Sequence, residues 1–273
     1  MEPVRFQVGE RTVVGLDDGE FIMREGFLNV AAYQDRFAGD DGVARLPIGC
    51  FLVPGETTVL IDAGMGPASF GGFLQGGALL DQLAACGMGP ADIDRVVVSH
   101  LHLDHCGWLA TPEAEPVFPH ADIWVGAGDW AHFVEGKAAR LAEPVRALLR
   151  ARAEQGRLTL IDRERSVVPG LTAVPAPGHT PGHTVFVVHD HGDRALILGD
   201  AMYCPGQLSD LDLEAVHDVD PVAARRTRAA IQLDLERHGS QAVGCHFPGL
   251  GAGRVIGGSW TASAAAGGAD AGR

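Results

Sequence analysis

The stretch RVVVSHLHLDH at residues 95–105 decides how this 273-residue chain folds, because an apolar run leads directly into four side chains of metal-binding types. Three consecutive valines predict a buried strand. Side chains two positions apart share a face of an extended chain, so His100 and His102 can approach one ion. If the chain turns at the strand end, Asp104 and His105 reach a second position close by. The pattern predicts a metal site, and the alternative is a polar loop of hydrogen-bonded histidines.

A second signal is PGHTPGH at residues 177–183, between two predicted strands. Its glycines and prolines favour a tight loop that can hold a histidine rigidly at a strand end. We expect His179 to be the ligand that this loop presents, and His183 to have a structural role beside it.

Two further signals each lie at the end of an apolar run. LILGD at residues 196–200 ends on Asp200, and a carboxylate at the mouth of a buried strand is costly unless it is paired or bound to metal. GCHFP at residues 244–248 places His246 at another strand end. Neither segment is specific alone. With the two motifs above, they complete a set of seven candidate ligands.

These four segments occur in the order found in the metallo-β-lactamase superfamily, which the chain resembles from about residue 10 to residue 256. VLIDAG at residues 59–64 is similar to the early strand and turn of that family. The resemblance implies an α/β (α+β) fold, an αββα sandwich of two mixed sheets flanked by helices, with a dinuclear site at one edge. The implied ligands are His100, His102 and His179 for one ion, Asp104, His105 and His246 for the other, and Asp200 bridging them.

Two departures narrow the resemblance. Class B β-lactamases do not place a bridging aspartate at the position of residues 199–200, whereas hydrolases of the glyoxalase II and lactonase type do. No basic helical domain of the kind that grips glutathione in glyoxalase II follows it. The chain most resembles the branch of N-acyl-homoserine lactonases and methyl parathion hydrolase-like enzymes, through residues 100–108, 199–207 and 245–255. Lactonases of this superfamily carry a tyrosine three residues after the bridging aspartate, where Tyr203 stands here.

The resemblance implies a dinuclear metal-dependent hydrolase. Imidazole and carboxylate ligands suit Zn²⁺, although iron, manganese and cobalt bind similar groups. A hydroxide bridging two ions, with a pKa near about 7, would attack a lactone or ester carbonyl, N-acyl-homoserine lactones (quorum quenching) included. Asp104 would take and return the proton, and Tyr203 would donate to the substrate oxygen. The alternative for Tyr203 is an aromatic residue of the core or the pocket rim.

Other functions compete with the lactonase hypothesis. Within the same fold these are phosphotriester (organophosphate) hydrolysis, glyoxalase II-like thioester hydrolysis and β-lactam hydrolysis. A metal-dependent nuclease is disfavoured because acids outnumber bases 35 to 21, for a net charge of −14, and phosphate backbones are repelled by that field. A binding protein on a degenerate fold is disfavoured because all seven ligand positions are filled.

Composition also limits location and partners. No run of 18 apolar residues predicts a membrane span, and residues 1–10 do not read as a secretory signal. Five cysteines without a CxxC pair favour the reducing cytoplasm over a disulfide framework. We therefore expect a small lactone or ester as substrate, no nucleic acid and no membrane. Related enzymes suggest a homodimer.

The chain reads as one hydrolase domain, residues 1–260, followed by an Ala/Gly-rich tail, residues 261–273, that we expect to be disordered. Residues 19–47 look irregular and are expected to form a loop or short helix over the sheet, with residues 21–37 apolar enough to cover the site. Trp108 is expected in the core rather than in a pocket wall. The remaining histidines are expected at the surface or in turns: His120, His132, His189, His191, His217 and His238. Predicted strands cover residues 11–16, 49–53, 58–61, 95–99, 158–161, 171–174, 184–188, 194–198 and 242–244. Predicted helices cover 78–86, 137–155, where Pro144 either interrupts the helix or begins a second one, and 221 to about 237.

Overall fold

Strand β7 (Arg95–Val97), which leads into the histidine motif, lies inside a nine-stranded mixed sheet. It pairs in parallel with β4 (Val59–Ile61) on one side and with β8 (Asp122–Gly126) on the other. The computed structural model describes residues 2–29, 38–136, 141–256 and 259–262. The other strands of this sheet are β1 (Val4–Val8), β2 (Arg11–Met23), β3 (Ala44–Val53), β5 (Ser69–Phe70), β6 (Leu74–Gln75) and β9 (Leu158–Ile161).

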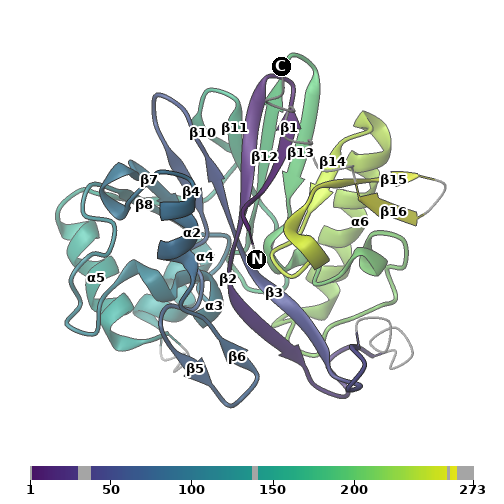
Figure 1. Cartoon of the computed structure of the whole chain (residues 1–273), viewed down its shortest axis with the longest axis horizontal. Coiled ribbons are helices and arrows are strands. Elements are labelled where there is room, and N and C mark those ends of the chain that lie inside the picture. The colour runs from purple at the N-terminus through teal and green to yellow at the C-terminus, as the bar shows by residue number, and fades with distance from the viewer. Residues whose placement is uncertain (1, 30–37, 137–140, 257–258, 263–273) are drawn as a thin grey trace, which may run out of the picture.

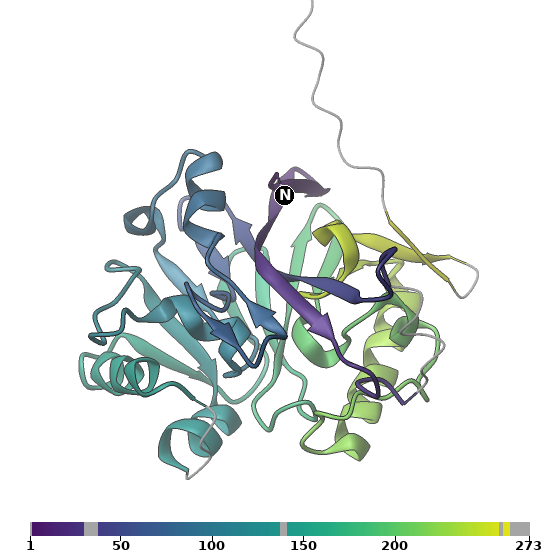
Figure 2. The same cartoon turned by 60° about the horizontal axis from the view of Figure 1, so that its bottom comes forward.

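The second sheet has seven strands in chain order, and each pair of neighbours is antiparallel except β13 and β14. Its strands are β10 (Arg165–Val168), β11 (Leu171–Pro175), β12 (Thr184–Asp190), β13 (Asp193–Ile197), β14 (Gln241–Val243), β15 (Gly253–Ile256) and β16 (Ser259–Ala262). Figures 1 and 2 show the long strands β2 and β3 between the two halves of the molecule.

Helices cover the outer side of each sheet (Figure 1). On the first sheet these are α2 (Leu79–Ala85), α3 (Leu103–Cys106), α4 (Ala127–Asp129) and α5 (Glu143–Glu154); on the second it is α6 (Pro221–His238). Short helical turns lie at Pro90–Asp92, Gly107–Leu109, Trp130–Glu135, Gly199–Ala201, Pro205–Leu208 and Pro248–Leu250.

Apolar side chains of both sheets meet in one buried layer between them. Phe51 and Ile61 from the first sheet belong to the same cluster as Phe186 and Ile197 from the second, and all four are fully buried. Separate clusters join the first sheet to its helices and the second sheet to α6. This arrangement confirms the expected α/β sandwich of two mixed sheets flanked by helices.

The two longer helices begin where proline and capping signals place them. Asp220 accepts a hydrogen bond from the Ala223 amide (2.9 Å), and α6 ends at Gly239, whose φ of 58° is left-handed. The cap and first-turn proline expected of this helix are therefore confirmed. The helix expected over residues 137–155 begins later, at Glu143, with Pro144 in its first turn; residues 137–140 lie outside the described part of the chain.

The prediction of an irregular segment at residues 19–47 is wrong at both ends, because β2 continues to Met23 and β3 already begins at Ala44. The register between the two strands shifts between Asp17 and Glu20. Such a bulge interrupts the alternation of apolar and polar residues, so the strand looks broken in the sequence. Residues 30–37, part of the segment expected to cover the site, are not described.

Several shorter strands were not predicted, namely β1, β8, β10, β15 and β16 and the β5–β6 pair. Strand β16 also contains Thr261 and Ala262, the first two residues of the expected tail, whereas residues 263–273 are outside the described part. Within the described residues, no helix has the length and apolar character needed to cross a membrane.

Candidate metal centre

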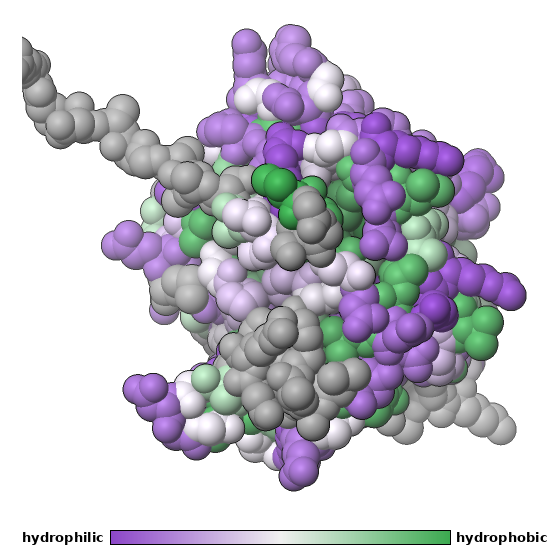
Figure 3. All heavy atoms as spheres, turned by 90° about the vertical axis from the view of Figure 1, so that its right-hand side faces the viewer, coloured by the Kyte–Doolittle hydropathy of each residue, from purple (hydrophilic) through white to green (hydrophobic). Residues whose placement is uncertain are grey.

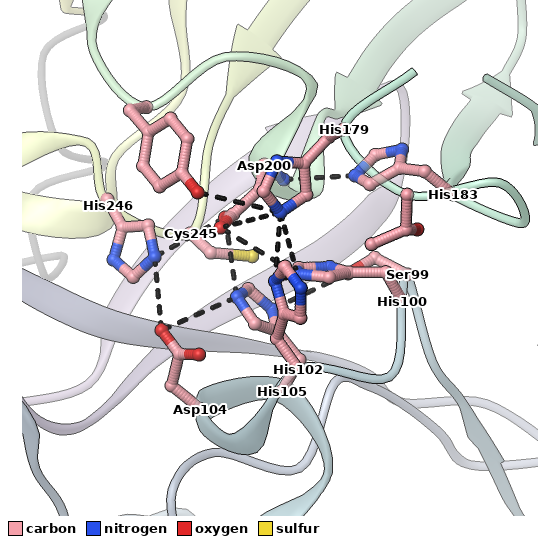
Figure 4. Close-up of polar contacts among 12 residues, drawn as sticks. Ser99, His100, His102, Asp104, His105, His179, His183, Asp200, Cys245 and His246 are labelled. Carbon is pink, nitrogen blue, oxygen red and sulfur yellow. Dashed lines mark hydrogen bonds and ion pairs between the residues drawn. The ribbon is translucent and has the colours of Figure 1, made fainter. Parts of the chain in front are cut away.

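Three histidine rings from two loops converge at the edge of the sandwich (Figure 4). His100 and His102 follow strand β7, and His179 lies in the loop between β11 and β12. Nε2 of His100 lies 2.9 Å from Nδ1 of His102 and 3.2 Å from Nε2 of His179, and the last two atoms are 3.0 Å apart. We call these three residues the imidazole group.

A second group, which we call the mixed group, consists of Asp104, His105 and His246. Oδ2 of Asp104 lies 3.7 Å from Nε2 of His105 and 3.5 Å from Nε2 of His246. Asp104 and His105 belong to the short helix α3, and His246 follows strand β14 of the second sheet.

Asp200 lies between the two groups, just after strand β13. Its Oδ1 is 3.3 Å from Nε2 of both His105 and His246. Its Oδ2 faces the imidazole group, 3.8 Å from Nε2 of His100 and 3.7 Å from Nε2 of His179. All seven sequence-predicted ligands are therefore brought together, with one carboxylate shared as the resemblance implies.

The donor atoms fit metal ions better than they fit one another. Nε2 of His105, Nε2 of His246 and Oδ1 of Asp200 are buried without a well-formed hydrogen bond, which is costly unless another partner is present. Zn–N bonds of about 2.0–2.1 Å in a tetrahedral site place two nitrogen atoms roughly 3.3 Å apart. The separations of 2.9–3.2 Å in the imidazole group are close to that spacing.

Asp62 aims His105 into the site and was missed as a functional residue in the sequence. Its Oδ2 accepts a hydrogen bond from Nδ1 of His105 (2.9 Å), and its Oδ1 accepts one from the Ser99 amide (2.6 Å). The Ser99 hydroxyl (2.8 Å) and the Cys245 thiol (3.2 Å) also donate to Oδ2. Because these donors occupy the carboxylate, Asp62 orients His105 rather than offering a free ligand.

The other strand-end histidines are also held through their second ring nitrogen. Nδ1 of His246 donates to the Pro47 carbonyl (2.7 Å), so Nε2 faces the site. His183 accepts a hydrogen bond from the Asp200 amide (3.1 Å) and lies outside both groups, in keeping with the structural role expected for it.

Asp129 ties the two ligand loops together and was also missed. It is fully buried, and it accepts hydrogen bonds from the amides of Leu101 (2.9 Å) and Gly182 (2.6 Å) and from the Thr180 hydroxyl (3.0 Å). A Cβ on Gly182 would lie 2.2 Å from the Asp129 amide nitrogen, so the PGHTPGH loop requires glycine there.

The two groups differ in charge. Burial, followed by the neighbouring His179 ring, lowers the pKa of His102 to about 3, and burial lowers that of His100 well below its usual value. Burial alone would also lower the pKa of His246, but Asp200 and Asp104 outweigh it and raise the pKa to about 10. The same two carboxylates, with Asp62, raise the pKa of His105.

Tyr203 points its hydroxyl at this site. The oxygen lies 3.5 Å from Nε2 of His179, and the ring stacks on that of His246 with centroids 5.5 Å apart and planes at 8°. An edge contact with Phe27, 4.8 Å between centroids, fixes its other side. Trp108 instead packs with the core and donates to Asp18 (2.8 Å), in agreement with its expected place.

A cavity of about 740 Å³ opens onto the two groups. His102, Asp104, Asp200 and Tyr203 form its metal end, and Arg24, Glu25 and His217 also line it; His217 is exposed, as expected. The apolar part of the wall consists of Phe21, Phe27, Phe70, Phe73, Leu74, Leu103, Leu141 and Val216.

A family model for the metallo-beta-lactamase superfamily matches residues 44–263. The uncharacterized protein YobT of Bacillus subtilis is 29% identical over 171 residues, which are 61% of this chain and 66% of YobT. An N-acyl homoserine lactonase of Bacillus thuringiensis is 25% identical over 184 residues, 61% of this chain and 68% of the lactonase. The matched regions thus span about two thirds of these relatives.

Among solved structures, AidC, described as a dizinc quorum-quenching lactonase in complex with the product N-hexnoyl-L-homoserine, superimposes with a TM-score of 0.81. The alignment covers 96% of this chain and 98% of AidC at 23% sequence identity. At that identity the likeness establishes the shared fold of the two proteins.

Proposed function

This chain belongs to the metallo-beta-lactamase superfamily, and from that premise we propose that it is a metal-dependent hydrolase that cleaves the ester bond of a lactone or carboxylic ester. The observation that carries the proposal is the shared Asp200, whose two oxygens face two separate groups of ligand atoms at the polar end of an apolar cavity. Two divalent ions, Zn²⁺ first among them, would be held by the seven ligands.

When bound, such ions supply a water-derived nucleophile at neutral pH and polarise the carbonyl oxygen. The chain's own residues do the rest. Asp104 lies at the cavity end of the mixed group, where its carboxylate takes up the proton that is lost on attack and returns it to the leaving alkoxide. The Tyr203 hydroxyl, aimed at the same end, donates a hydrogen bond to the substrate oxygen as negative charge develops.

The cavity favours a substrate with a small polar head and an apolar tail. The candidate ligands and Tyr203 form its metal end, phenylalanine and aliphatic side chains form most of the remaining wall, and Arg24, Glu25 and His217 add polar groups to that wall. Phe21 and Phe27 are buried and pack against one another with ring centroids 5.0 Å apart, so this part of the wall is rigid. An N-acyl homoserine lactone has this distribution of polarity, and the name of the Bacillus thuringiensis relative supports that substrate.

The test is a substrate panel on protein of measured metal content. We expect hydrolysis of N-acyl homoserine lactones and loss of activity in His102→Ala. The control His120→Ala should keep full activity, because His120 is exposed and belongs to neither group of candidate ligands. If a phosphotriester, a thioester or a β-lactam is hydrolysed and lactones and carboxylic esters are not, the ester assignment is wrong. If no metal binds and none can be restored, the metal-dependent mechanism falls.

The remaining proposals concern context. We propose a small-molecule substrate and no nucleic-acid partner, on the net charge of −14. A homodimer rests on the family resemblance, and a cytoplasmic location rests on cysteines that form no CxxC pair. We also propose residues 1–260 as one hydrolase domain. Light scattering of the purified chain tests the dimer, and a monomeric mass would overturn it.

A further inference from the structure

Behind the imidazole group lies a buried ion pair that no step of the proposed reaction uses. Oδ1 of Asp218 is 3.2 Å from Nδ1 of His179, the ring nitrogen that faces away from the other two histidines. Oδ2 of Asp218 accepts a hydrogen bond from the Arg228 guanidinium (2.9 Å). Both side chains are 1% exposed.

The backbone on either side of this contact is fixed by the start of helix α6. The Asp220 amide donates to the Gly178 carbonyl (2.9 Å), and the Thr227 hydroxyl donates to the Pro177 carbonyl (2.6 Å). With the loop held in this way, the main freedom left to His179 is rotation of its ring. The ring can present Nε2 to the site only while Nδ1 has a partner behind it.

We infer that Asp218 is a positioning residue for the proposed metal site, and that Arg228 holds it in place. The Asp218 carboxylate accepts the Nδ1 proton of His179, which fixes the tautomer with a free lone pair on Nε2 and strengthens that nitrogen as a ligand. The inference rests on the proposed function and adds to it a connection from helix α6 to the imidazole group.

Arg228 is buried, unlike the hydrophilic side chains that project into solvent on the outer face of this half of the molecule. Figure 3 shows the outer face of this half of the molecule, where hydrophilic side chains project into solvent between small apolar groups. Arg228 belongs to helix α6 but is among the largest fully buried side chains among the described residues. Its Nε and one terminal nitrogen have no hydrogen-bond partner in the described part of the chain, so its charge depends on Asp218. Burying a guanidinium with so few hydrogen bonds is costly, and the benefit is that the Asp218 carboxylate is held in one position.

A purely structural ion pair is the rival explanation, and a double variant separates the two. Removing one partner strands a buried charge, whereas removing both leaves none. The variants are Asp218→Asn, Arg228→Met and the two combined. Arg225→Met is the matched control, because Arg225 lies on the same helix and pairs with Asp212 at the surface. Each full-length protein is stripped of metal, its thermal midpoint is recorded, and binding of Zn²⁺ and the absorption spectrum with Co²⁺ are measured.

We expect Asp218→Asn to weaken binding of the ion in the imidazole group by about 10- to 100-fold, the usual effect of losing such a partner. Both single variants should lower the thermal midpoint. The double variant should recover the midpoint but not the Zn²⁺ affinity, and its Co²⁺ spectrum should stay altered. The control should match the unaltered protein throughout.

If Zn²⁺ affinity returns together with the midpoint in the double variant, or Asp218→Asn binds Zn²⁺ normally, the positioning role is overturned. In either case the unaltered protein still binds metal. If the unaltered protein itself binds none, the proposed function fails instead, so the two failures are distinguishable.

Discussion

The imidazole group and the mixed group share Asp200 but differ in the charge that surrounds them. His100 and His102 have lowered pKa values because they are buried among other rings, whereas His246 has a raised pKa because two carboxylates face it. The imidazole group has no carboxylate of its own among its three members, and the mixed group has Asp104. Within the described residues, Asp200 is therefore the acid that faces the ligand atoms of the imidazole group, while Asp218 reaches that group only from behind, through His179.

The largest effect is expected from removing that shared acid. Asp200→Ala should lower kcat/KM by about a thousandfold or more, since metal polarisation contributes several kcal/mol and 1.36 kcal/mol is tenfold. Metal content, measured by elemental analysis, should also fall. Asp193→Asn, at the opposite end of strand β13, is the control and should retain both ions. Full metal content in Asp200→Ala would show that the two groups do not depend on this carboxylate.

The two groups should also fail separately. His102→Ala and His246→Ala each remove one ligand from one group only, so each variant should lose about one ion per chain and keep the other. Titration with Co²⁺ should give different spectra for the two variants, because three imidazoles with the shared Asp200 and two imidazoles with two carboxylates differ in field strength. If each variant loses both ions together, the two groups act as one site, and the prediction that they bind their ions separately is wrong.

Tyr203 contacts a histidine of each group, and its substitution should lower kcat without changing the metal content. Tyr203→Phe keeps the ring stacked on His246 but removes the hydroxyl near His179. Loss of such a donor costs about a hundredfold in kcat or more. Metal content should be unchanged. A variant with unaltered kcat would return Tyr203 to the role of a pocket-wall aromatic.

The smallest effect is expected from Asp62, which supports a histidine of the mixed group only. Asp62→Asn weakens the support of His105, so Zn²⁺ affinity of the mixed group should fall by roughly 10- to 100-fold while the imidazole group keeps its affinity. Chelator competition, read separately for the two ions, measures this. Equal weakening of both ions would mean that Asp62 acts through the fold of the whole loop.

The clustering of the seven candidate ligands was predictable because all seven lie in short motifs or at the ends of apolar runs. HLHLDH contains four candidate ligands within six residues, and the strand before it places them together at the edge of the sheet. The supporting role of Asp62 and Asp218 has no such local signal. Asp62 follows the apolar strand β4 much as Asp200 follows β13, but the histidines that Asp62 and Asp218 orient lie 43 and 39 positions away in sequence.

The fold class was predictable for the same reason, and its irregular parts were not. Strands with a sustained apolar pattern, such as β12 and β13, were found near their observed ends. Strand β2 was cut short because its bulge breaks the pattern at Asp17 to Glu20. Strand β8 was not predicted, although β13 of the same length was.

Neither sheet carries a complete group: His179 and His246 come from the second half, and the ligands that they join come from the first. The halves are linked in sequence only by the exposed residues 162–164 between β9 and β10. A chain nicked there would leave two fragments that each hold only part of both groups, so the complete set of ligands would exist only when the fragments are together. The same division makes the protein a natural candidate for a split reporter, in which recovered hydrolysis signals that two fused partners have met.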